Sequence, residues 1–256
     1  MIRWSAHVSM LFTDLPAVDR PGAARDAGFE LVESWWPPAD DPGEWARAVA
    51  AAGVGVACLN ADGGDIAAGE RGFCNMPERD ADTFAAAGQA LALAERVGAP
   101  CVNVLPGLVA ADRPRDEQVD HAVAVYRELG RMAAVSGRTI VVEPINAVDV
   151  PRYLLPTATD VAGLLRRVDH PDVRMLFDAY HCARGGGDPI AEAVAHVDLI
   201  GHVQYADHPG RGAPGTGDVP IGAFRSALGE AGYDGPIGLE FDPRGPTLDA
   251  LRVLGM

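Results

Sequence analysis

The stretch Thr139–Asn146 (TIVVEPIN) shows the pattern on which the fold depends, a β-prone apolar run that ends on a carboxylate. Its β-branched residues favour a buried strand. The helical pattern Glu117–Val135 precedes this run, and the helical pattern Ala158–Val168 follows it. Strands that alternate with amphipathic helices are typical of parallel sheets, because a helical crossover must carry the chain back before the next parallel strand begins.

The same alternation extends outward over the whole chain. The other strands are predicted at Ile2–Val8, Phe29–Glu33, Val54–Leu59, Cys101–Leu105, Val173–Phe177, Leu199–Gln204 and Pro236–Glu240. The other helices are predicted at Pro16–Ala27, Asp41–Ala52, Ala81–Val97, Pro189–His196, Gly222–Ala231 and Thr247–Leu254. About eight strand–helix units predict an α/β fold of the (β/α)₈ TIM-barrel type, with residues 1–256 as one domain. The alternative is an open, doubly wound sheet, but Ser9–Asp14 after the first strand lacks the G-x-G-x-x-G motif of a dinucleotide site.

Composition excludes several classes of partner. The chain has 36 acidic and 21 basic residues and a formal net charge of −15, which repels nucleic acid and acidic membrane surfaces. No run approaches the roughly 18 apolar residues of a membrane span, and the N-terminus lacks the apolar core of a signal peptide. The four cysteines form no C-x-x-C pair. We therefore expect a cytoplasmic protein whose partner is a small molecule.

Polar side chains end four successive predicted strands. These are Glu143, Asp178, Gln204 and Glu240. Active groups of a TIM barrel lie at the carboxyl ends of its strands, so these side chains can converge over one half of the barrel mouth. Three carboxylates and one amide oxygen suit a hard divalent cation such as Mg²⁺ or Mn²⁺, and without a cation the carboxylates would repel one another.

Further polar residues surround these strand ends. His181 is expected in the loop after the sixth strand, and His202 is interpreted as a hydrogen-bonded histidine of the barrel core. His7 and Asn103, near the ends of the first and fourth strands, could reach a substrate. Arg211 lies in a glycine-rich loop that lacks the G-K-[ST] ending of a phosphate-binding P-loop.

Nearly the whole chain resembles the hydroxypyruvate isomerase family of the xylose isomerase-like TIM barrels. The matching segments are Ser5–Phe12, Ala67–Gly72, Glu143–Asn146, Asp178–His181, Gly201–Gln204, Arg211–Gly217 and Gly238–Glu240. The resemblance implies that Glu143 and Glu240 are the acid/base pair and that they bind a divalent metal together with Asp178 and Gln204. It also implies that His181 and Arg211 contact substrate, and we expect Glu70, His7 and Asn103 to line the same site.

The implied reaction is an aldose–ketose type proton transfer through an enediolate, which converts hydroxypyruvate into 2-hydroxy-3-oxopropanoate (tartronate semialdehyde). The alternative is a ketose 3-epimerase or sugar isomerase with a neutral or specialised-metabolism substrate. Asp242 favours this alternative, since the family pattern has Lys or Gln there and a carboxylate would repel that of hydroxypyruvate. A binding protein without activity, and a hydrolase or lyase with the same metal site, are further alternatives. The related endonucleases need additional histidines and a less acidic chain. A homo-oligomer is possible.

Overall fold

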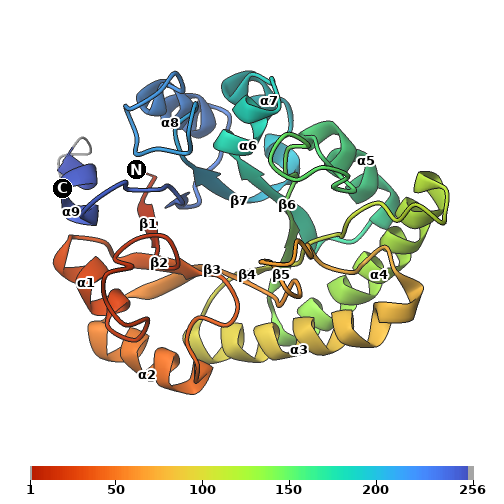
Figure 1. Ribbon diagram of the computed structural model, residues 1–256, viewed down its shortest axis with the longest axis horizontal. Helices are drawn as coiled ribbons and strands as arrows, with labels where there is room; N and C mark the ends of the chain where they lie inside the picture. The colour runs from red at the N-terminus through yellow and green to blue at the C-terminus, as the bar shows by residue number, and fades with distance from the viewer. Residues whose placement is uncertain (1, 253–256) are drawn as a thin grey trace.

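A computed structural model describes residues 2–252, and in it eight parallel strands close into a barrel in chain order (Figure 1). The strands are β1 (Trp4–His7), β2 (Leu31–Ser34), β3 (Gly55–Asn60), β4 (Cys101–Asn103), β5 (Thr139–Val142), β6 (Val173–Asp178), β7 (Ile200–Tyr205) and β8 (Ile237–Leu239). Each strand overlaps its predicted range, and its two ends lie within two residues of the predicted ends. The predicted TIM barrel is confirmed, whereas the assignment of residues 1–256 to one domain stays a prediction.

Helices surround the barrel and pack against its outer face (Figure 1). The described residues form α1 (Arg20–Asp26), α2 (Pro42–Ala52), α3 (Asp80–Val97), α4 (Arg115–Ser136), α5 (Ala158–Val168), α6 (Ala179–Arg184), α7 (Pro189–Ala195), α8 (Ile221–Glu230) and α9 (Thr247–Leu251), with 3₁₀ turns η1 (Pro77–Arg79) and η2 (Val197–Leu199). Within residues 2–252, no helix has the length and apolar character needed to cross a bilayer.

Helix α5 shows how local sequence sets these elements. The Thr157 hydroxyl accepts from the backbone N–H of Asp160, and the Asp160 carboxylate accepts from that of Thr157, which makes a capping box at the first turn. Val161, Leu165 and Val168 recur at helical spacing on the buried face. The capping box and the apolar period indicate the same helix, and the predicted bounds of this helix match the observed ones.

Two of the predictions concern the ends of elements, the residues after β6 and the last helix. His181 was expected in a loop, and this was wrong: it lies in the short helix α6, directly after β6. The helix starts there because the Asp178 carboxylate accepts from the backbone N–H of Tyr180, as an N-cap residue does. The last helix was predicted to reach Leu254, but residues 253–256 lie outside the described residues.

Candidate active site

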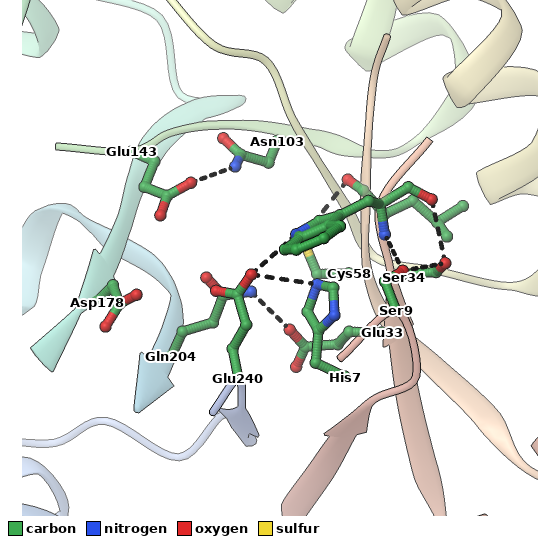
Figure 2. A network of polar contacts seen from close by, with 12 residues as sticks. His7, Ser9, Glu33, Ser34, Cys58, Asn103, Glu143, Asp178, Gln204 and Glu240 are labelled. Carbon is green, nitrogen blue, oxygen red and sulfur yellow. Dashed lines mark hydrogen bonds and ion pairs between the residues drawn. The ribbon is translucent and has the colours of Figure 1, made fainter. Parts of the chain in front are cut away.

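Four neighbouring strands direct polar side chains to the mouth of the barrel. Glu143 follows β5, Asp178 and Gln204 lie at the ends of β6 and β7, and Glu240 follows β8. Figure 2 shows the four side chains pointing toward one another. All four are at most 5% exposed, so the structure brings together the residues predicted from the strand ends, in a place largely removed from water.

Among the described residues, the partners of the Glu143 carboxylate are neutral. Its Oε2 atom accepts a 2.7 Å hydrogen bond from the Asn103 amide, and its Oε1 atom lies 3.8 Å from Nε2 of His181. Burial raises the pKa of Glu143 well above its ordinary value, and the negative charges of Glu240 and Asp178 raise it further. A carboxyl group of this kind keeps its proton to a higher pH than an exposed glutamate does.

Asp178 has one occupied and one free oxygen. Its Oδ1 atom caps α6 by accepting from the Tyr180 N–H at 2.7 Å, whereas Oδ2 has no hydrogen-bond partner within the described residues. Arg211 and His181 each lie 3.8 Å from Oδ2. Burial raises the pKa of Asp178 to about 7, although the positive charge of Arg211 opposes this change.

Glu240 is held from both sides. The indole N–H of Trp35 donates to Oε1 at 2.8 Å, and Arg211 forms a 2.9 Å ion pair with Oε2. Nε2 of His7 lies 3.7 Å from Oε1. The two predicted acid/base residues therefore differ: Glu143 has no cation as a hydrogen-bond partner, and Glu240 has a direct one.

The tautomer of His181 follows from its neighbour Asn146. The Asn146 side-chain oxygen accepts from the backbone N–H groups of Val148 and Asp149, so its NH₂ group faces Nδ1 of His181, at 2.7 Å. Nδ1 must then accept, which leaves the ring proton on Nε2, the nitrogen that faces Glu143 and Asp178. Burial and the charge of Arg211 lower the pKa of His181 to about 3, so the ring is a neutral donor.

The oxygens of this site fit a divalent cation. Glu143, Asp178 and His181 bring possible ligand atoms within 4.8 Å of one another. Two buried acceptors, Asp178 Oδ2 and Gln204 Oε1, have no hydrogen-bond partner within residues 2–252. Buried polar atoms normally find a partner, and carboxylate and amide oxygens are ligands of hard cations. His181 is less suited, because its Nε2 atom carries the proton.

The remaining predicted residues lie at different places around the mouth. His7 is buried at the end of β1 and its ring packs on Trp35 with 5.3 Å between centroids, while Asn103 contacts Glu143. The Glu70 carboxylate accepts from the Asp65 N–H and pairs with Arg79, so it contacts its own loop. Substrate contact by these residues stays a prediction.

Three residues that position side chains of the candidate site escaped the sequence analysis or were given a lesser part in it. Trp35 has no part in the sequence analysis, but its indole N–H donates a hydrogen bond to Glu240. Asn146 was noted only within a motif, although it sets the tautomer of His181. Asp207, fully buried, accepts from three backbone N–H groups of the loop that carries Arg211. An acid directly after a strand and before a glycine-rich loop was the available signal for Asp207.

Comparisons with known proteins agree with this geometry. The chain is 34% identical over 258 residues to the 2-oxo-tetronate isomerase of Cupriavidus necator, covering 99% of this chain and 98% of that one. It is 30% identical to the hydroxypyruvate isomerase of Escherichia coli, covering 98% of each chain. A crystal structure described as an AP endonuclease, family 2, from Brucella melitensis superposes with a TM-score of 0.95 at 29% identity, over 100% of this chain and 98% of that one. Residues 21–255 match the family model described as xylose isomerase-like TIM barrel, and the chain belongs to this family.

Proposed function

We propose that this protein is an isomerase that moves a proton between adjacent carbons of a small hydroxy-carbonyl compound. The reaction would convert hydroxypyruvate into 2-hydroxy-3-oxopropanoate or act on a close relative. The observation that carries the proposal is the pair of buried carboxylates, Glu143 and Glu240, over one barrel mouth. Nearly full-length relatives named as isomerases of hydroxypyruvate and 2-oxo-tetronate support it.

The two glutamates would divide the proton transfer between two carbons. One takes the proton from C3 of hydroxypyruvate and the other delivers a proton to C2, while the hydroxyl proton passes from the oxygen on C3 to the oxygen on C2. A positioned acid or base with a pKa near the working pH contributes about 10²- to 10⁴-fold to the rate, and the raised pKa of Glu143 suits this task. Trp35 and Arg211 orient Glu240. The Nε2–H of His181 would donate to a substrate oxygen.

A divalent cation, Mg²⁺ or Mn²⁺, held by Glu143, Asp178, Gln204 and Glu240 would act as a Lewis acid toward the substrate carbonyl. We therefore expect dialysis against EDTA to reduce kcat by at least tenfold and Mn²⁺ or Mg²⁺ to restore it. An unchanged rate would contradict the cation and leave the glutamates working through hydrogen bonds.

The test of the reaction is NMR of hydroxypyruvate incubated with the protein in deuterated water. We expect 2-hydroxy-3-oxopropanoate with deuterium at C2, together with loss of one of the two C3 protons, while the other remains as the aldehyde proton. If neither hydroxypyruvate nor any small ketose exchanged protons, the chain would be a binding protein and the proposal would fail.

A neutral substrate is the second candidate, and the charge of −15 together with Asp242 favours it. The Asp242 side chain is exposed and accepts from the backbone N–H of Arg244 at 3.0 Å. If its charge excludes hydroxypyruvate, Asp242→Lys should raise kcat/KM for hydroxypyruvate. Product analysis separates the reactions, since an aldose–ketose pair indicates an isomerase and two ketoses indicate an epimerase. The same charge opposes a nuclease activity, because a DNA backbone would be repelled.

A further inference from the structure

Another buried acid, Glu33, lies inside the barrel. It belongs to β2, is 1% exposed, and reaches across the interior to β7, which is not a neighbour of β2 in the sheet. Its Oε1 atom lies 2.9 Å from Nε2 of His202, and its Oε2 atom accepts a 3.0 Å hydrogen bond from the Gln204 amide nitrogen. Figure 2 shows Glu33 and Gln204 joined in this way.

A glycine on β8 leaves room for the Glu33 carboxylate inside the barrel. Gly238 on β8 pairs with Gln204 in the sheet, and a Cβ atom at Gly238 would lie 2.3 and 2.5 Å from the two oxygens of Glu33. Any larger residue would occupy the space of the carboxylate. The absent side chain at Gly238 therefore gives Glu33 room to reach β7.

The chemistry of these groups determines which way the Gln204 amide faces. An ionised carboxylate only accepts hydrogen bonds, so the group of Gln204 that faces Glu33 must be the NH₂ group. The amide oxygen then points the other way, toward the strand ends, where it is buried without a hydrogen-bond partner in the described residues. If the amide were reversed, two N–H donors would face the site and repel a cation.

We propose that Glu33 is a positioning residue that turns the Gln204 amide oxygen toward the site where a divalent cation binds. This inference rests on the proposed function, since it assumes that cation. His202 contributes by binding the second oxygen of Glu33, so that the carboxylate cannot rotate away from Gln204. Loss of a group that orients a metal ligand costs about 10- to 100-fold in metal affinity.

The test is a cycle of variants titrated with Mn²⁺, with free Mn²⁺ followed by its EPR signal. In Glu33→Gln, the new amide at position 33 can accept a hydrogen bond from His202 with its oxygen and donate one to Gln204 with its NH₂ group. The Gln204 amide must then reverse, and we expect Mn²⁺ affinity to fall 10- to 100-fold. When Gln204→Glu is also present, the amide at position 33 donates to one oxygen of the carboxylate at position 204. The second oxygen of that carboxylate still faces the site. In this background, Glu33→Gln should leave Mn²⁺ affinity unchanged or improve it.

A merely structural Glu33 predicts a different result. Glu33→Gln would then lower the free energy of unfolding in both backgrounds and change Mn²⁺ affinity equally in both, or in neither. Either outcome would overturn the inference. If the single variant does not fold, the double variant must still bind Mn²⁺ at least as tightly as Gln204→Glu. Wild-type protein that binds no Mn²⁺ would instead contradict the cation of the proposed function, and this inference with it.

The chain offers a matched control for a buried glutamine. The Gln118 side chain is 1% exposed and makes hydrogen bonds with Asn75, Ala110 and Arg113, none of which belongs to the candidate site. Gln118→Glu should lower the melting temperature and leave Mn²⁺ affinity within twofold of wild type.

Discussion

Two clusters around buried carboxylates lie within one barrel, and their environments are opposite. In the paired cluster, which consists of Glu33, His202 and the Gln204 amide nitrogen, both carboxylate oxygens have donors. In the open cluster, which consists of Glu143, Asp178 and Glu240, the cation that the described residues supply is Arg211, which lies 2.9 Å from Glu240 and 3.8 Å from Asp178.

The pKa values record this difference. Burial would raise the pKa of Glu33, but the charge and hydrogen bond of His202 lower it below its ordinary value. Burial raises the pKa of Glu143 and of Asp178, and no partner reverses that change. Glu33, whose two oxygens both have donors, holds the structure together, whereas Asp178, with one oxygen that has no hydrogen-bond partner in the described residues, is prepared for a ligand or a proton.

The largest expected effect is a loss of activity without a loss of folding, when one carboxylate of the open cluster is replaced. Glu143→Gln keeps the shape of the side chain and the Asn103 contact but removes the proton acceptor. We expect kcat to fall by about 10²- to 10⁴-fold while the circular dichroism spectrum and melting temperature stay close to wild type. Glu128→Gln, on the exposed face of α4, is the control and should change neither. A Glu143→Gln variant with most of its kcat would remove Glu143 from the acid/base pair.

The two clusters should also respond to pH with opposite signs. Asp178 has a pKa of about 7 in the folded protein and 3.8 ordinarily, so the folded state binds more protons between these values. In EDTA, its contribution to the free energy of unfolding is therefore present below pH 4 and is lost as pH rises through about 7, a change on the order of 4 kcal/mol. Glu33, with a lowered pKa, contributes stability above its ordinary pKa of 4.5 and loses it as pH falls.

Urea denaturation at several pH values measures this difference. Asp178→Asn keeps a capping oxygen for α6 and removes the titration, so its stability should vary less between pH 4 and 7 than that of wild type. Equal slopes for the two proteins would show that Asp178 titrates normally.

The next prediction disrupts the paired cluster by adding one methyl group beside Glu33, without a change of charge. Gly238→Ala places a methyl group against the Glu33 carboxylate and should lower the free energy of unfolding by about 3 kcal/mol, because a buried pair is forced apart. Gly222→Ala is the control, since a Cβ atom there meets no atom within 4 Å and alanine favours the α8 helix. Equal stability of the two variants would mean that the barrel accommodates the methyl group.

The smallest effect concerns the hydrogen bond between Trp35 and Glu240. Trp35→Phe keeps an aromatic ring beside His7 and removes the indole donor. Because Trp35 is 40% exposed, we expect a loss of about 1 kcal/mol or less in the free energy of unfolding. A severalfold decrease in kcat/KM should accompany it, since Glu240 loses one of its two orienting contacts. An unchanged kcat/KM would show that Arg211 alone holds Glu240.

Prediction from sequence was most accurate where one local rule decided the outcome. The bounds of α5 follow from Thr157, Asp160 and the apolar period, which all lie within a dozen residues. The helix α6 was missed, because its start depends on a cap that the Asp178 side chain makes at the end of a strand. Gln204 was predicted as a ligand from its strand end, but its orientation depends on Glu33, 171 residues away in the chain.

The sequence by itself determined the alternating strands and helices and the polar residues at four strand ends, because periodicity and turn chemistry act over a few residues. Closure of the barrel then brought side chains of β2 and β7, which are not neighbours in the sheet, into contact, and it placed Arg211 beside Asp178 and Glu240. Only the tertiary structure decided which acids have partners, since an ion pair or hydrogen bond depends on distances of about 3 Å between residues far apart in the chain.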